Sequence, residues 1–145
     1  MHPNASIVRR PALALVLLAL AATGCGAAQR PSGSAQACAV GDWRGTGEDE
    51  GGTHWEFTLV LREEGPDLVG AFHWVGSDGS VGDEQIRGHA DCGARTFEWQ
   101  GESATGGSDT MDVVTGHYTG TFGDDLASFS GRWVGGTPGT LQGTR

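Results

Sequence analysis

The sequence predicts an all-β domain, a single small antiparallel up-and-down barrel of about eight strands, and three observations support this fold class. After residue 37 no segment carries apolar residues at helical spacing over ten or more positions, whereas several segments alternate apolar and polar residues. The large apolar residues of those segments fall on one face, and the polar residues fall on the other. Clusters of Gly, Pro, Asp and Ser separate the segments, as turns do.

Eight short strands are expected along the chain. They lie at 42–47, 53–62, 68–75, 85–91, 96–101, 113–122, 127–133 and 140–144. Turn-rich pieces separate them at 64–67, 77–80, 123–125 and 135–139. Short strands joined in sequence order by short turns indicate a meander, and a two-sheet β-sandwich is the alternative arrangement.

One face of the expected strands would form the core. Its large apolar residues are Trp55, Phe57, Leu59, Leu61, Leu68, Phe72, Trp74, Phe97, Trp99, Tyr118, Phe122, Phe129 and Trp133. Four glycines, at 70, 88, 120 and 131, are in phase with these rings. Because alternating small and large residues fill the interior of a small barrel and closure removes exposed sheet edges, a closed barrel is favoured over the sandwich.

Residues 1–24 predict a secretory signal peptide. Arg9 and Arg10 precede an uncharged apolar run at 12–22, and small residues follow it. The run has about eleven residues, whereas a membrane-spanning helix needs roughly 20. Residues 25–37 have the composition of a flexible linker, which leaves 38–145 for the barrel domain.

The quartet Ala22-Thr23-Gly24-Cys25 resembles the bacterial lipobox. This resemblance implies that Cys25 is the site of lipidation and that the mature protein is held to a membrane of the bacterial cell envelope by its N-terminal lipid. Gly26 stands where an Asp would mark inner-membrane retention, so the outer membrane is expected in a Gram-negative host. The alternative is that Cys25 is an ordinary residue beside the cleavage site.

The charge and the cysteines narrow the expected partners and the compartment. The chain has 18 acidic residues against 9 arginines, and cleavage would leave a charge of 7 minus 18, or −11. Such a surface disfavours nucleic acid and suits cations or a basic envelope protein. In an oxidising compartment Cys38 and Cys92 would form a disulfide. Closing this loop would contribute about 4 kcal/mol in the chain-entropy model.

Two short motifs resemble those of calycin barrels. Gly41-Asp42-Trp43 is similar to the Gly-x-Trp that opens lipocalins, and the segment 130–136 looks like the penultimate strand of the avidin group. The lipocalin resemblance implies a small apolar ligand and a Trp43 that plugs one barrel end. The avidin resemblance would imply biotin, but Gly45, Phe72 and Trp74 replace its polar ligand residues, so biotin binding is rejected.

No motif assigns a catalytic residue, a cofactor or a metal. GxSxG and HExxH are absent, and no dinucleotide fingerprint is complete. The histidines at 54, 73, 89 and 117 are expected to face solvent, and 78–84 lacks most calcium-loop ligands, so a Gly-rich turn is expected there. The acidic run 48–50 is expected to be a solvated hairpin tip. Glu56 and Glu98 point with the polar set, so no carboxylate is expected on the apolar face.

These features favour a non-enzymatic binding module on a lipid anchor. The rim loops at 76–84 and 101–112 would contact a protein partner, for example as an inhibitor of a basic enzyme. A carrier of a small apolar ligand is the first alternative, and it needs a cavity of at least roughly 300 Å³. An enzyme acting at the rim is the second alternative, with His89, His117 and Asp91 as the residues to substitute first.

Overall fold

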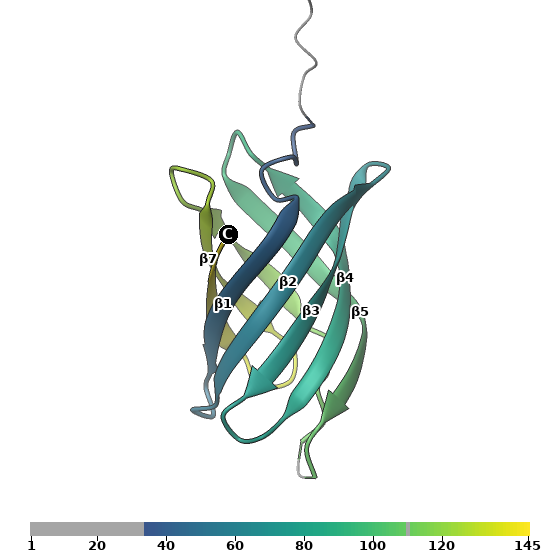
Figure 1. The fold of residues 1–145 in the computed structure, drawn as a ribbon, viewed down its shortest axis with the longest axis vertical. Coiled ribbons are helices and arrows are strands. Elements are labelled where there is room, and N and C mark those ends of the chain that lie inside the picture. The colour runs from purple at the N-terminus through teal and green to yellow at the C-terminus, as the bar shows by residue number, and fades with distance from the viewer. Residues whose placement is uncertain (1–33, 110) are drawn as a thin grey trace, which may run out of the picture. The chain divides into compact units, whose positions relative to one another are not determined.

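In the computed structural model, which describes residues 34–109 and 111–145, eight antiparallel strands close into one barrel (Figure 1). The strands are β1 (Gly41–Asp49), β2 (His54–Glu64), β3 (Asp67–Gly76), β4 (Val81–Asp91), β5 (Thr96–Gly107), β6 (His117–Phe122), β7 (Ser128–Val134) and β8 (Gly139–Thr144). Each strand pairs with the next, and β8 pairs with β1. The predicted meander and its closure are therefore confirmed.

The predicted leader 1–24, Cys25 and most of the predicted linker lie outside the described residues. Within the described ranges no helix is long and apolar enough to cross a membrane.

The interior of the barrel is filled by aromatic rings. Every large apolar residue predicted for the core is buried. Phe97 and Trp99 stack with centroids 4.0 Å apart, and Phe72 and Trp74 stack at 4.6 Å. A Cβ atom on Gly131 would lie 2.9 Å from the ring of Phe97, so the inward glycine makes room for that ring. Glycines in phase with the rings therefore let a narrow barrel hold them.

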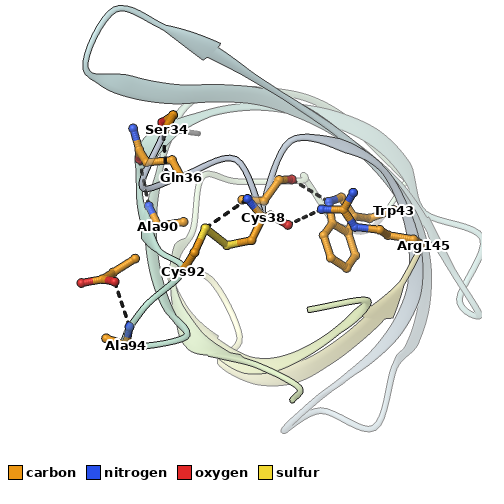
Figure 2. The surroundings of a disulfide bond; sticks show 10 residues. Ser34, Gln36, Cys38, Trp43, Ala90, Cys92, Ala94 and Arg145 are labelled. Carbon is orange, nitrogen blue, oxygen red and sulfur yellow. Dashed lines mark hydrogen bonds between the residues drawn. A yellow bond between two sulfur atoms is a disulfide. The ribbon is translucent and has the colours of Figure 1, made fainter. Parts of the chain in front are cut away.

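One end of the barrel is sealed by the segment 34–40, called here the N-terminal cap (Figure 2). The predicted disulfide is present, joining Cys38 in the cap to Cys92 after β4 with a Cα–Cα distance of 5.7 Å. Trp43 plugs this end, as expected, and its indole N–H donates to the Ala39 carbonyl at 2.8 Å. The guanidinium of Arg145 lies 4.5 Å from the centroid of the Trp43 ring and donates to the Cys38 carbonyl. The cap, the disulfide and the C-terminus thus form one closed end.

The observed strands differ from the predicted ones mainly at the other end. β4 begins at Val81 rather than residue 85, β5 continues to Gly107, and β6 begins only at His117. Gly82, Gly106 and Gly107 have low strand propensity, but pairing between β4 and β5 keeps them within the strands. The two rim loops expected at 76–84 and 101–112 are therefore largely strand, and the loops that remain are 77–80 and 108–116, the latter described except at residue 110.

Candidate binding site at the open end of the barrel

The end opposite the cap is open and contains a pocket. We call this end the mouth; its loops are 50–53, 77–80, 108–116 and 135–138. Its cavity, called here the mouth pocket, has a volume of about 210 Å³. Four aromatic side chains line it, Trp55, Trp74, Tyr118 and Trp133, together with Asp49, Glu84, 111–114 and 135–137. At the mouth, side chains of the barrel interior therefore line a pocket at the surface of the molecule.

Glu84 is a carboxylate inside the barrel wall. It lies on β4 in the inward phase, and only 1% of its surface is exposed. One carboxylate oxygen accepts the backbone N–H of Gly116 at 2.7 Å, and the other accepts the hydroxyl of Tyr118. Burial raises the pKa of Glu84, because desolvation penalises its charged form more than the hydrogen bonds from Tyr118, Gly116 and Trp74 favour it. Burial and the neighbouring carboxylate also raise the pKa of Tyr118, so its hydroxyl remains a donor.

Asp49 is the second carboxylate of the mouth pocket, and it is only 6% exposed. It accepts the backbone N–H of Thr53 at 3.0 Å and the indole N–H of Trp55 at 3.1 Å. Burial by itself would raise its pKa, but these hydrogen bonds outweigh burial and hold the pKa below the ordinary value. Asp49 is therefore ionised at neutral pH, and it fixes the indole of Trp55 in the pocket wall.

Both carboxylates correct expectations drawn from the sequence. No carboxylate was expected on the apolar face, yet Glu84 continues the inward phase of Ile86 on β4. Asp49 was expected in a solvated hairpin tip, yet it continues the inward phase of Trp43 on β1, while Glu48 and Glu50 are exposed. Extending the observed alternation by one step beyond each predicted strand would have found both residues.

A β-bulge makes room for Glu84. Gln85 pairs with Ser103 and Ile86 pairs with Gly101, so Glu102 is an extra residue on β5. Glu102 points outward, where it accepts a hydrogen bond from Arg87 at 2.9 Å. A Cβ atom on Gly101 would collide with the carboxylate of Glu84, so only glycine fits at that position. The bulge and Gly101 together let a charged side chain occupy the inner wall.

The histidines lie on the outer wall, as expected. His73 is 2.8 Å from a carboxylate oxygen of Asp83, and His117 is 2.8 Å from one of Glu98. The structure does not bring His89, His117 and Asp91 together at the rim. Asp91 caps the β4–β5 turn by accepting the N–H of Ala94, whereas His117 begins β6 near the mouth.

The turn 77–80 uses its own polar groups. The carboxylate of Asp78 accepts both the backbone N–H and the hydroxyl of Ser80, each at 2.9 Å. Glu84, the last residue of the segment considered as a calcium loop, lies in β4. Among the described residues no group of three or more His, Cys, Asp or Glu side chains is arranged to hold a metal ion.

The mouth is also distinguished by its surface. Six large apolar side chains are exposed among the described residues, and five of them surround the mouth: Val75, Val81, Met111, Val114 and Val134. The four mouth loops carry Glu50, Asp78, Asp109 and Asp112, and their sequences contain no Lys or Arg. A larger hollow of about 1170 Å³ lies along the polar outer wall, but it includes neither buried carboxylate. Exposed apolar side chains and carboxylates with no arginine in the same loops therefore occur together at this end of the barrel.

The chain matches no protein-family model and no curated protein. Among solved structures, a redesigned β-barrel bound to DFHBI is similar with a TM-score of 0.59 and 16% identity, covering 77% of this chain and 98% of that one. Another redesigned β-barrel has a TM-score of 0.59 and 17% identity over 77% and 94% of the two chains. A de novo designed fluorescence-activating β-barrel has a TM-score of 0.51 and 15% identity over 73% and 92%. The chain therefore has the fold of a small, closed, eight-stranded antiparallel barrel.

Proposed function

We propose that this protein is a lipid-anchored binding module of the bacterial envelope that captures a compact ligand, or one group of a larger one, in the mouth pocket. The observation that carries this proposal is the pocket itself, which is lined by two buried carboxylates and four aromatic side chains. Small-molecule sites are concave and largely apolar, with a few polar groups that fix orientation. The mouth pocket has this composition.

The size of the pocket limits the ligand. Its volume of about 210 Å³ is below the roughly 300 Å³ at which pockets for drug-sized ligands begin. Ring contacts such as those of Phe97 with Trp99 fill the barrel below it. A ligand held deep in the barrel is therefore disfavoured, and the apolar carrier expected from the sequence is narrowed to a compact group at the mouth.

Two further observations support binding at this end. The similar redesigned barrel was solved with a small molecule, DFHBI, so a barrel of this size can serve as a binding scaffold. The exposed apolar residues around the mouth offer contact area for a ligand. Groups of exposed apolar side chains on a protein surface often mark an interaction site.

The proposed anchor and the proposed site are compatible. The described chain enters the barrel at the closed end, through the cap that Cys38 ties to Cys92 (Figure 2). An acylated Cys25 would therefore be joined to the barrel through its closed end, and the mouth is the opposite end of the barrel (Figure 1).

Native mass spectrometry of the protein isolated from the membranes of an exporting cell tests this function. We expect a stoichiometric small mass that is lost on unfolding. Val114→Trp, which fills the pocket edge, should abolish the bound mass, whereas Val60→Trp on the outer wall should keep it; the two valines are 50% and 51% exposed. A bare wild-type mass, or a bound mass that survives Val114→Trp, would contradict capture at the mouth and would favour a protein partner elsewhere.

A further inference from the structure

Resting on the proposed function, we infer that the group received by the mouth pocket is a cationic nitrogen, either an ammonium or a guanidinium, seated between Trp side chains and the carboxylates of Asp49 and Glu84. Three features lead to this chemistry: the negative charge of the pocket, which has no cationic partner among the described residues, the aromatic wall of the pocket, and the absence of arginine from the mouth loops.

The negative charge of the pocket has no cationic partner among the described residues. Their salt bridges join Arg or His to carboxylates in nine contacts on the outer wall and turns, and none involves Asp49 or Glu84. Both carboxylates instead accept hydrogen bonds from neutral donors. Because buried charges are normally paired, a carboxylate that lines a pocket without a cation is complementary to a cation from outside.

The aromatic wall suits the same ligand. Trp74 lies in the middle of the lining, with ring centroids 6.2 Å from Trp55, 5.9 Å from Trp133 and 6.4 Å from Tyr118. These rings are set at different angles around the pocket, from stacked to edge-on. The face of an indole attracts a cation, and the attraction increases where water is excluded. A purely apolar ligand would use the rings but would leave the charge of Asp49 without compensation.

The surroundings would guide a cation to the pocket. Of the six arginines after residue 37, Arg95 and Arg145 lie at the closed end, and none lies in the four mouth loops. The carboxylates of those loops therefore have no neighbouring guanidinium in the same loops. A cleft lined by charge of one sign raises the local concentration of ions of the opposite sign.

Matched pairs of small molecules separate charge from shape in the full mature protein. The cations are choline, phenethylamine and N-acetylarginine amide, and their neutral counterparts are 3,3-dimethyl-1-butanol, 2-phenylethanol and N-acetylcitrulline amide. Indole N–H resonances report the position of binding by NMR. Trp55 and Trp133 line the pocket, and Trp43 at the closed end is the internal control.

We expect at least one cation to shift the Trp55 and Trp133 signals, leave Trp43 unchanged and bind about tenfold or more tightly than its neutral counterpart. Choline or phenethylamine as the preferred probe would identify a free amine as the source of the cation. The arginine derivative would instead identify a side chain of a basic partner protein.

Charge-removing variants test the role of the carboxylate itself. Glu84→Gln should weaken cation binding by about tenfold, whereas Glu98→Gln on the outer wall should not change it. The amide introduced by Glu84→Gln keeps a carbonyl oxygen that can accept the Gly116 N–H, so this variant is expected to fold.

Equal affinity of cations and neutral counterparts, with shifts at Trp55 and Trp133, would overturn the cation inference and leave the proposed function intact. The absence of shifts with all six compounds would also overturn the cation inference. In that case the native-mass comparison of Val114→Trp with Val60→Trp decides separately whether the mouth binds a ligand at all.

Discussion

At the scale of the residue, Glu84 is expected to reduce stability at neutral pH. Burial raises its folded-state pKa above the ordinary 4.5, so the folded protein binds this proton more tightly than the unfolded chain does. Its contribution to stability is full below pH 4.5 and is lost as the pH rises through the raised pKa. Glu84→Gln should therefore stabilise the protein by about 1 kcal/mol at neutral pH. Urea unfolding against pH checks this, and an equal or lower stability of the variant at neutral pH would contradict it.

The contribution of Asp49 to stability should depend on pH with the opposite sign. Its folded-state pKa is below the ordinary 3.8, so its stabilisation is present above that pH and is lost as the pH falls through the folded value. Asp49→Asn removes the charge from the hydrogen bonds to Thr53 and Trp55. It should destabilise the protein at neutral pH by about 2 kcal/mol. The same unfolding series measures it, with Glu50→Gln as the exposed neighbour for comparison; equal losses in the two variants would argue against a structural role of Asp49.

Inward glycines set a steric limit on the barrel. A Cβ atom on Gly45 would overlap the carbonyl oxygen of Gln142 and the ring of Phe57. Gly45→Ala is therefore expected to destabilise the fold by about 3 kcal/mol. Gly93→Ala is the matched control, because its Cβ would meet only Asp91 at 3.3 Å. Thermal unfolding of both variants checks this, and a small loss in Gly45→Ala would mean that β1 and β8 can move apart.

At the scale of the element, the sequence predicts the strand bounds well wherever apolar and polar residues alternate without interruption. Every buried position of β2 and β3 holds a large apolar residue except Gly70 and Gly76, and the predicted ends of these strands differ little from the observed ones. The mouth ends of β1, β4 and β5 were less predictable, because their inward positions hold Gly, Ala, Asp or Glu. Such residues resemble loops in composition, and only cross-strand pairing shows that they are strands.

The candidate site was less predictable than the fold for the same reason. The bulge at Glu102 shifts the inward phase of β5, so Ala104 rather than Ser103 pairs with Glu84. A shift of this kind depends on the partner strand and leaves no periodic signal in β5 itself. Asp49 and Glu84 meet in one pocket only because β1 and β4 lie around a closed barrel, which no local pattern records.

The disulfide is expected to act on the cap and to leave the mouth unchanged. Cys38 and Cys92 are 54 positions apart, so the bridge stabilises the fold by about 4 kcal/mol in the chain-entropy model. The double variant Cys38→Ala/Cys92→Ala should melt at a lower temperature, and a reducing agent should lower only the wild-type value. The indole N–H signals of Trp55 and Trp133 in the double variant should remain those of the wild type. Altered mouth signals in the folded variant would show that the two ends are coupled.

At the scale of the whole molecule, the barrel has two chemically different ends. The closed end is held by a disulfide, the buried ring of Trp43 and the guanidinium of Arg145. The mouth combines exposed apolar residues with carboxylates that no arginine neutralises within its loops. The covalent cross-link therefore lies at the end where the chain enters, and Glu84, the carboxylate expected to reduce stability, lies at the end where a ligand would enter.

The difference between the two ends of the barrel gives the proposed lipid anchor a testable consequence. If Cys25 carries acyl chains, Cys25→Ala should move the protein from the membrane fraction to the soluble fraction. The intact mass should also lose the mass of the lipid. We expect this because several acyl chains buried in a membrane hold a protein far more firmly than a barrel surface does. The melting temperature and the cation affinity should be unchanged, since Cys38 and Cys92 still form their bridge and the mouth lies at the other end. Membrane association that persists without the acyl mass would instead place the attachment on the barrel itself. In that case the exposed apolar residues around the mouth would be the first surface to test, and the orientation of the domain would be reversed.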